Sequence, residues 1–373
     1  MGARAPDAVL IGGGVMGCAS ALALAEAGAK VVVLEKSVPG AEASSAAAGI
    51  LGAQSEAHEP GPLFELARMS RSLYGALAER LQRATGIDVG YRPSGVLEVA
   101  SDRERRAELT HKVAWQIEAD TGVALLERPL VAQLEPALAA ENTFGVDFAG
   151  DGRIDPPLLL KALHIAASRA GAEFRAGAYV RAIDVDGDLA RGVVLEDGAR
   201  IESPVVVVAA GSWSTLVVGV PLAPGAVKPA RGQIALLELG EPPIRRVIVG
   251  PKCYLVPRDD GRVLVGSTLE FVGYRREVTA RAVRDLLNAA IELVPCLAEA
   301  TLGRTWSNFR PYTDAGTPFI GPTHVRGLYL ATGHYRNGIL LAPITAEIVR
   351  ALAQGTPPPI DLAPFAATAE SRT

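Results

Sequence analysis

The residues that most clearly suggest chemistry begin with a glycine-rich loop near the N-terminus. Residues 12–17 read Gly-Gly-Gly-Val-Met-Gly, a G-x-G-x-x-G pattern, and an acidic residue, Glu35, follows about 20 residues on. In such a loop Gly12 permits a tight turn, Gly14 lets the backbone approach a pyrophosphate, and Gly17 allows the next helix to pack closely. Glu35 can accept hydrogen bonds from a ribose hydroxyl. The pattern therefore predicts a dinucleotide site, and by itself it fits NAD and FAD equally.

A run of small residues follows from Ser44 to Gly52. Its side chains have too little bulk for a core strand. Such a run suits a backbone that lies against a large flat ligand, with Ser44 and Ser45 near phosphate. A flexible small-residue loop is the alternative interpretation of this segment.

A second group of chemically suggestive residues lies in the C-terminal third of the chain. Arg310 stands in the segment 308–312, and residues 332–343 read Thr-Gly-His-Tyr-Arg-Asn-Gly-Ile-Leu-Leu-Ala-Pro. This second segment reads as a strand end followed by a helix, so it predicts a helix N-terminus aimed at an electron-rich group. Tyr254, in the predicted strand 253–258, is either a core or edge aromatic residue or a ligand contact.

The elements around these residues follow from the apolar pattern. A buried strand over residues 8–11, a helix over 18–27 closed by Gly28 as its C-cap, and a strand over 30–34 give the order that a dinucleotide fold requires. Residues 62–84 read as one amphipathic helix, and another helix starts at Pro156 with Asp155 as its N-cap.

Several short strands follow that second helix. Residues 178–185, 192–196 and 205–209 read as strands, Gly198 marks a turn between the last two, and strand 205–209 returns to the first sheet. Short alternating strands over 228–266 predict an antiparallel sheet that forms a substrate domain.

Length and composition narrow the function classes. The 373 residues predict two domains; 49% are hydrophobic and 21% charged, which is typical of a globular protein. A net charge of -4 argues against a nucleic-acid partner. Three cysteines without short ligand spacing predict free thiols and no metal site. The chain shows no signal-peptide pattern and no apolar run of about 18 residues, so we expect a cytoplasmic protein without a membrane span.

Taken together, these segments resemble the D-amino acid oxidase family of flavoproteins, and most of all its bacterial glycine oxidase branch. The resemblance covers essentially the whole chain. It rests on the segments GGGVMG, SSAAAGILGA, GRIDPP, AAGSWS, KCYLVPR, FRPYTDAGTPFIG and GHYRNGILLAPIT.

The resemblance implies an α/β fold, with a Rossmann-like FAD-binding domain of the D-amino acid oxidase/glutathione reductase type and an α+β substrate domain on an antiparallel sheet. It implies a discontinuous FAD-binding domain over 1–92, 152–225 and 308–373, and a substrate-binding domain over 93–151 and 226–307. The implied cofactor is FAD, held without a covalent bond because no cysteine stands near Tyr312, where sarcosine oxidases of the family attach the flavin.

The resemblance also assigns site residues. The implied cofactor-binding residues are Gly12, Gly14, Val15, Met16, Gly17, Glu35, Lys36, Ser44, Ser45, Ala47, Ala48, Gly49, Val180, Gly211, Gly333, His334, Arg336, Asn337, Gly338 and Ile339. Tyr254, Arg310 and Arg336 are the implied catalytic residues, and Ile50 joins these three at the substrate. Arg suits a substrate carboxylate because its planar fork binds it bidentately. For His334, backbone positioning or packing is favoured over a role as a base. Lys252 departs from the family pattern, in which glycine oxidases carry a His, and this affects the expected pocket entrance.

The implied reaction is oxidative deamination of a small amino acid, with glycine the leading substrate. The Cα hydride passes to flavin N5, oxygen accepts the electrons to give hydrogen peroxide, and the imine is hydrolysed to glyoxylate and ammonia. The resemblance further implies a homotetramer and a role in supplying the imine to thiazole synthase for thiamine. Sarcosine, proline and small D-amino acids stay open as substrates, since one methylene changes pocket energetics by only about 1–3 kcal/mol.

Two other interpretations remain. One is a flavin dehydrogenase subunit that acts on glycine, proline or sarcosine and passes electrons to a quinone or a partner protein. The other is a non-catalytic flavin-binding module. The presence of Tyr254, Arg310 and Arg336 together argues against the module, because a pure binding protein has no use for a carboxylate clamp beside a flavin.

Overall fold

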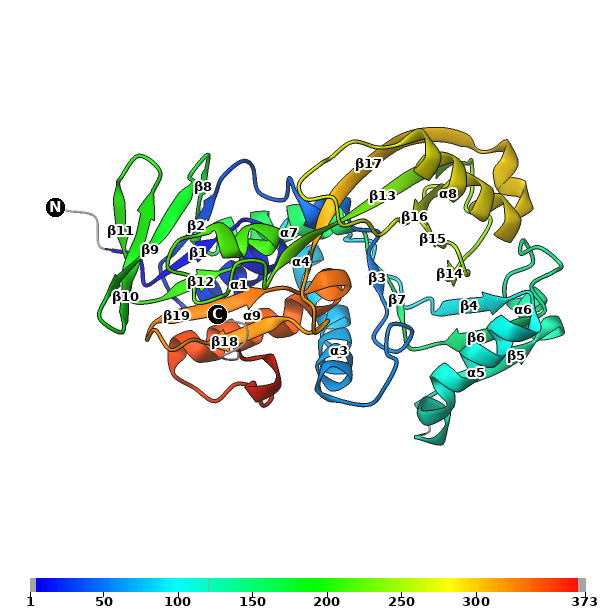
Figure 1. Ribbon diagram of the computed structural model, residues 1–373, viewed down its shortest axis with the longest axis horizontal. Helices are drawn as coiled ribbons and strands as arrows, with labels where there is room; N and C mark the ends of the chain where they lie inside the picture. Colours follow the sequence, from blue (N-terminus) through cyan, green and yellow to red (C-terminus); the bar gives the residue numbers. More distant parts are fainter. Residues whose placement is uncertain (1–4, 120, 368–373) are drawn as a thin grey trace.

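The computed structural model describes residues 5–119 and 121–367. Two large sheets dominate it and occupy opposite halves of the elongated molecule in Figure 1. The first has the order β18-β19-β12-β1-β2-β8. Its strands are β1 (Ala8–Ile11), β2 (Val31–Glu35), β8 (Glu173–Ala176), β12 (Val206–Val208), β18 (Phe319–Pro322) and β19 (Leu328–Thr332).

This first sheet is parallel except for its edge pair β18–β19. From β1 the chain first adds β2 on one side and later β12 on the other. The strand order therefore reverses at β1, and the crevice beyond the carboxyl ends of such strands is where α/β sheets bind ligands.

The second sheet has eight strands in the order β17-β13-β16-β15-β14-β4-β6-β5. These are β4 (Val96–Ala100), β5 (Val123–Glu127), β6 (Phe144–Phe148), β13 (Lys228–Glu238), β14 (Val247–Val249), β15 (Tyr254–Pro257), β16 (Arg262–Gly266) and β17 (Thr301–Tyr312). All neighbours are antiparallel except β14 and β4. The predicted fold class, a Rossmann-like domain with a substrate domain on an antiparallel sheet, is confirmed.

The expected domain boundary at residue 308 falls inside β17. This strand pairs with β13 from Thr301 to Tyr312, across both sides of that boundary.

Helix α1 (Val15–Glu26) follows β1 and is apolar on nearly all sides. Such a helix must be covered all round, and α7 (Pro156–Arg169) and α9 (Gly338–Gln354) pack against it. It starts before the predicted Cys18, and its C-cap is Ala27. Gly28 is the next residue, with a φ of 86° that favours glycine, so the predicted C-cap was one residue late.

The single helix predicted over 62–84 is wrong: there are two, α3 (Pro62–Ser72) and α4 (Tyr74–Thr85). The break lies against α9. Pro343 has no N–H for the carbonyl of Ile339 four residues earlier, and the Tyr74 hydroxyl donates to that carbonyl instead. Ser70 donates to Leu340 O at 2.6 Å and accepts from the N–H of Ile344 at 3.3 Å. The break between α3 and α4 thus lies where a side chain from each helix hydrogen-bonds to the backbone of α9 around Pro343.

Two smaller sheets complete the strands: β3 (Ile50–Leu51) with β7 (Gly152–Arg153), and β9 (Val180–Asp186) with β10 (Leu189–Leu195) and β11 (Arg200–Glu202). Strand β11 was not predicted, and Gly198 turns the chain from β10 into β11. The predicted N-cap is confirmed, because Asp155 accepts from Leu158 N. The remaining α-helices of the described residues are α2 (Ala43–Ala46), α5 (Arg103–Glu118), α6 (Arg128–Leu134) and α8 (Ala280–Leu293).

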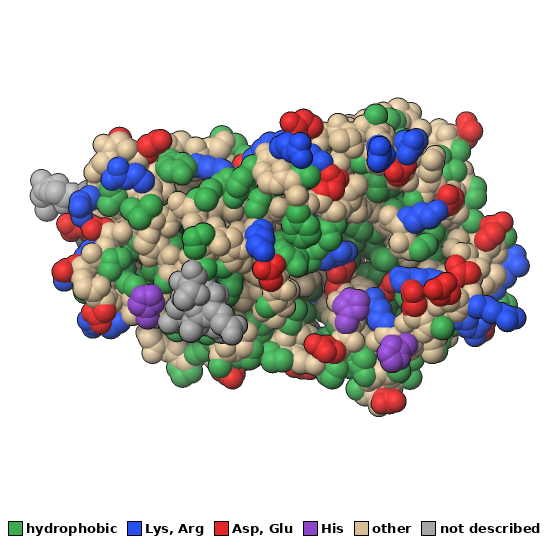
Figure 2. All heavy atoms as spheres, viewed as in Figure 1, with side chains coloured by type: hydrophobic (Ala, Val, Ile, Leu, Met, Phe, Trp, Pro, Cys, Tyr) green, Lys and Arg blue, Asp and Glu red, His purple; other side chains and the backbone are tan. Residues whose placement is uncertain are grey.

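On the face in Figure 2, acidic and basic side chains are interspersed over both halves. Within residues 5–119 and 121–367, no helix is both long and apolar enough to cross a bilayer.

Candidate active site

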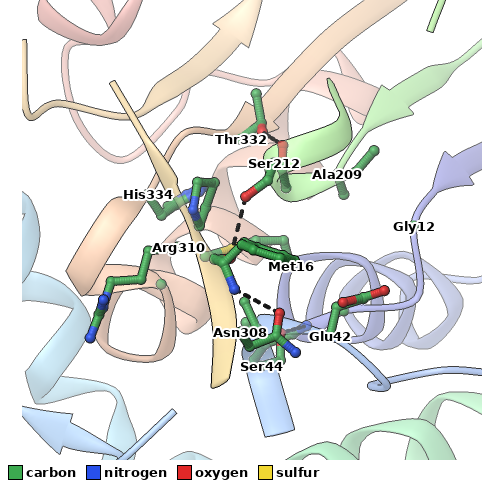
Figure 3. A pocket seen from close by; sticks show the side chains of 18 of the residues that line it. Gly12, Met16, Glu42, Ser44, Ala209, Ser212, Asn308, Arg310, Thr332 and His334 are labelled. Atoms are coloured by element: carbon green, nitrogen blue, oxygen red, sulfur yellow. Dashed lines mark hydrogen bonds between the residues drawn. The ribbon is translucent and has the colours of Figure 1, made fainter. Parts of the chain in front are cut away.

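A large pocket lies between the two main sheets and encloses about 1760 Å³, including the space at its open mouth. Segments far apart in the sequence meet around it: the β1–α1 loop, residues 42–50, residues 209–217, strand β17 and the β19–α9 connection. Figure 3 shows this convergence, with Gly12, Ser44, Ala209, Arg310 and Thr332 around one space. The pocket therefore exists only once both sheets are assembled.

The glycine loop leaves no room for side chains. Gly12 has a φ of 107°, and a Cβ there would lie 2.6 Å from Ala209 O. A Cβ on Gly17 would lie 1.9 Å from Gly12 O. Hence Gly12 keeps the loop against β12, and Gly17 keeps α1 against the loop, where the first N–H groups of a helix favour an anion.

Glu35 is fixed at the end of β2. Its carboxylate accepts from Gly13 N at 2.8 Å and from Ser37 N at 2.9 Å. Beside it, the Lys36 ammonium lies 3.4 Å from the centre of the Trp213 ring and 3.7 Å from a Glu42 oxygen. Burial, partly offset by Glu42, lowers the pKa of Lys36.

The small-residue run is held by hydrogen bonds along its backbone, which does not support the flexible-loop alternative. Trp306 Nε1 donates to Ala46 O at 3.0 Å, and Arg258 donates to Ala48 O at 2.7 Å. Ser44 Oγ accepts from Val15 N at 3.0 Å, which joins the run to the start of α1. Ser45 is turned away and donates to Gly40 O.

Gly49 is packed too closely against its surroundings for a side chain to fit. It has a φ of 84°, and a Cβ there would lie 2.1 Å from Ile154 O.

At the start of α9, His334 is buried and hydrogen-bonded. Its Nε2 lies 3.1 Å from Thr345 Oγ1, and burial lowers its pKa to about 3. The imidazole is therefore neutral at physiological pH, as a packing and positioning role requires. Gly333 lies beneath it with a φ of 75°, and a Cβ there would meet Thr313 at 2.7 Å.

Arg310 and Tyr254 come from different strands of the eight-stranded sheet. Gly232 on β13 and Gly266 on β16 make room for them, since a Cβ on Gly232 would lie 2.3 Å from the Arg310 guanidinium and one on Gly266 2.4 Å from the Tyr254 ring. Arg310 donates to Thr268 O at 3.2 Å and to the Ser267 hydroxyl. Among the residues that the structure describes, it forms no ion pair.

Arg336 has a different environment. Its Nε lies 2.9 Å from one oxygen of Glu56 and its Nη2 3.3 Å from the other. Glu56 is the main cause of a raised pKa for Arg336. Both residues line the pocket, so the two site arginines differ: one is neutralised by a carboxylate and one is not.

Most predicted site residues line the pocket, and three do not. Gly17, Ser45 and Gly333 lie behind the wall, where they support the loop, the run and the start of α9. Lys252 is not among the residues that line the pocket and pairs with Glu292 at 2.9 Å, so an effect of its departure from the family pattern on the entrance stays a prediction. The residues found at the wall are Gly12, Gly14, Val15, Met16, Glu35, Lys36, Ser44, Ala47, Ala48, Gly49, Ile50, Val180, Gly211, Tyr254, Arg310, His334, Arg336, Asn337, Gly338 and Ile339.

Several pocket residues were missed by sequence reasoning. Glu42 and Glu56 stand just outside the recognisable segments, Trp213 lies within the segment AAGSWS without having been assigned a role, and Asn308 lies two residues before Arg310 on the same face of β17. The alternation of a strand could have identified Asn308. Nothing in the local pattern marks the other three, which reach the pocket through the fold.

Comparison with known proteins agrees with this geometry. The profile of the family described as FAD dependent oxidoreductase (DAO) matches residues 7–352. This chain belongs to that family. Glycine oxidase of Geobacillus kaustophilus is 37% identical over 369 residues, which cover 97% of this chain and 96% of that protein. The crystal structure of glycine oxidase from that organism superposes with a TM-score of 0.93 and covers 98% of both chains.

A second relative is longer. The bifunctional protein ThiO/ThiG of Synechocystis is 35% identical over 350 residues, which cover 92% of this chain and 51% of that protein. This chain therefore spans about half the length of the bifunctional relative. The resemblance to the D-amino acid oxidase family, the enzyme class and FAD as cofactor are confirmed, and FAD rather than NAD is the dinucleotide.

The residues of the pocket fit FAD. Gly12 and Gly14 form a loop whose backbone can approach a pyrophosphate closely, and Glu35 stands where a ribose would be bound. Residues 46–50 present small side chains to a flat ring. The start of α9, from Asn337 to Ile339, supplies the opposite wall. The dinucleotide site and the two arginines therefore share one cavity.

Proposed function

We propose that this chain is an FAD-dependent oxidase of small amino acids, with glycine as substrate and glyoxylate, ammonia and hydrogen peroxide as products. The observation that carries the proposal is the Arg310 guanidinium, which lines the FAD pocket with no carboxylate partner among the described residues. A cation in such a site favours an anionic ligand, and arginine suits a carboxylate.

In this proposal the chain's own residues orient the substrate. Arg310 holds the carboxylate, and Tyr254, whose ring lies against Gly266 on the neighbouring strand, adds a hydroxyl donor. Holding a reactant in one geometry supplies much of the rate enhancement of such a reaction. Bound FAD supplies the two-electron acceptor. His334 stays neutral and contributes packing at the start of α9, so no side-chain base is assigned.

Glycine is proposed over larger amines because of the relatives, which include a glycine oxidase that matches nearly the whole chain. We further propose that the imine product serves thiazole synthase in thiamine formation. The bifunctional ThiO/ThiG relative supports this, since this chain aligns with half of it. Non-covalent attachment of FAD, a homotetramer and a cytoplasmic location stay predictions.

The test is the absorbance of the purified holoenzyme under anaerobic conditions before and after glycine is added. Bleaching of the flavin band, followed by hydrogen peroxide formation when air is admitted, is expected. Flavin that glycine does not bleach would reject glycine, and sarcosine, proline and D-alanine would be compared next. Bleaching without peroxide in air would favour the dehydrogenase interpretation, with a quinone or a partner protein as acceptor.

A further inference from the structure

The unequal environments of the two site arginines bear on substrate choice. Arg310 and Arg336 both line the pocket, but among the residues that the structure describes only Arg336 is paired with an acid, through contacts of 2.9 Å and 3.3 Å to Glu56. The pair engages both oxygens of Glu56. An arginine engaged in this way has less capacity to bind a second carboxylate from a ligand.

The position of Glu56 is fixed by hydrogen bonds that residues outside the pocket make to the two residues before it. Asp151 is fully buried and accepts from Ser55 N at 2.8 Å and from Gln54 N at 3.1 Å, directly before Glu56. Lys112 and Gln116 on α5 hold the carbonyls of the same two residues, Lys112 to Ser55 O at 2.6 Å and Gln116 to Gln54 O at 3.0 Å. The segment that carries Glu56 is therefore anchored from both sides, which fixes the carboxylate opposite Arg336.

We propose that Glu56 is a specificity-determining residue that restricts the pocket to amines with a single carboxylate. It neutralises Arg336 and leaves Arg310, which has no acidic partner among the described residues, to receive an anionic substrate. A ligand with a second carboxylate near Arg336 would have to displace Glu56 or lie beside its negative charge, and such repulsion is a common basis of specificity. This inference rests on the proposed function, since it takes Arg310 as the carboxylate receptor.

The experiment compares two ligands that cannot react, acetate with one carboxylate and malonate with two. Each is titrated into the holoenzyme, and its Kd is read from the perturbation of the flavin absorbance spectrum. In Glu56→Gln, Arg336 loses its partner, so we expect the affinity for malonate relative to acetate to rise about tenfold, as for one added hydrogen bond to a charged group. The double variant E56Q/R336Q should lose that gain.

Glu42→Gln is the matched control. It removes one negative charge from the same pocket, but Glu42 pairs with Arg276 and Lys36 and not with Arg336. Its malonate-to-acetate ratio should equal that of the wild type. Glu56→Ala, made alongside, should reproduce the gain seen in Glu56→Gln and guards against an effect of the new amide.

The outcomes separate the two proposals. If acetate and malonate both fail to perturb the wild-type flavin and Arg310→Ala changes nothing, the carboxylate site of the proposed function is overturned. If acetate binds through Arg310 but both Glu56 variants keep the wild-type ratio, the proposed function stands and the role of Glu56 is overturned. A gain that persists in E56Q/R336Q would also overturn it, because Arg336 would not be the receptor.

Discussion

Arg310 owes its proposed role to what surrounds it. A glycine at position 232 provides the space for its guanidinium, and its described partners are a carbonyl and a hydroxyl rather than an acid. A guanidinium with such neutral partners keeps its positive charge available to bind an anionic ligand. Its loss is therefore expected to affect substrate binding more than folding.

We expect Arg310→Ala to lower kcat/KM for glycine by about two to four orders of magnitude, which corresponds to about 3–5 kcal/mol, because the substrate carboxylate loses its ionic partner. Arg310→Lys should recover only part of this loss, since an ammonium lacks the planar fork. Steady-state kinetics give the effect, and the ratio of flavin to protein confirms that FAD is retained. Unchanged kinetics in Arg310→Ala would remove Arg310 from the site.

Substitutions at two glycines can distinguish the effect of backbone strain from loss of the close-packed loop that holds the cofactor. Gly12 and Gly28 both have positive φ, 107° and 86°, but a Cβ at Gly12 would meet Ala209 O at 2.6 Å while nothing lies within 4 Å of one at Gly28. Gly12→Ala should yield protein largely free of FAD, and Gly28→Ala should keep its FAD and lose only stability. Flavin content per protein measures both. Equal flavin loss in the two variants would contradict the role of this loop.

Among the elements, α9 shows most directly how the fold reaches the site. Its first residues form one wall of the pocket, and its interior contains Pro343, which leaves the carbonyl of Ile339 without a helical partner. Tyr74, fully buried at the start of α4, donates to that carbonyl. The break between α3 and α4 and the wall of the pocket are thus parts of one arrangement.

Tyr74→Phe should lower the free energy of unfolding by about 1–3 kcal/mol, because it leaves a buried carbonyl unsatisfied. Ile339 lines the pocket, so weaker FAD binding is expected in the same variant. Tyr91→Phe is the matched control, since this ring stacks on Tyr74 at 6.0 Å but is only partly buried. Denaturant unfolding and FAD titration of the two variants should differ; equal behaviour would argue against the role of the Tyr74 hydroxyl.

For the molecule as a whole, the burial of His334 makes the stability of the folded protein depend on pH. Burial lowers its pKa to about 3 in the folded protein, from an ordinary value of 6.5. Between these values the unfolded chain binds a proton that the folded protein does not, so acid favours unfolding. Stability from this residue is fully present above pH 6.5 and is lost as the pH falls toward 3.

The holoenzyme should therefore lose stability between pH 6.5 and 3 with a contribution from His334 of up to about 1.4 kcal/mol per pH unit. His334→Gln has no titrating ring and should show a shallower slope, while every other titrating group is shared by both proteins. Denaturant unfolding at several pH values gives the difference. Parallel curves for wild type and variant would show that His334 is not a neutral buried group.

The sequence alone was enough for the features that depend on local pattern. The glycine loop, the strand–helix–strand order around it and Glu35 are close together in the chain, and each has a conformational or packing reason that holds in any such unit. The antiparallel sheet over 228–266 followed from short alternating strands between turns. The family resemblance then distinguished FAD from NAD, which the loop could not do.

Tertiary structure decided what depends on residues distant in sequence. The break at Leu73 lies where Ser70 and Tyr74 hydrogen-bond to α9, some 270 residues later in the chain. The boundary expected at 308 falls within a strand because β13 pairs along the whole of β17. The contrast between Arg310 and Arg336 is of the same kind. Both are arginines in recognisable segments, and only the fold, by bringing Glu56 beside one of them, gives them different charge environments.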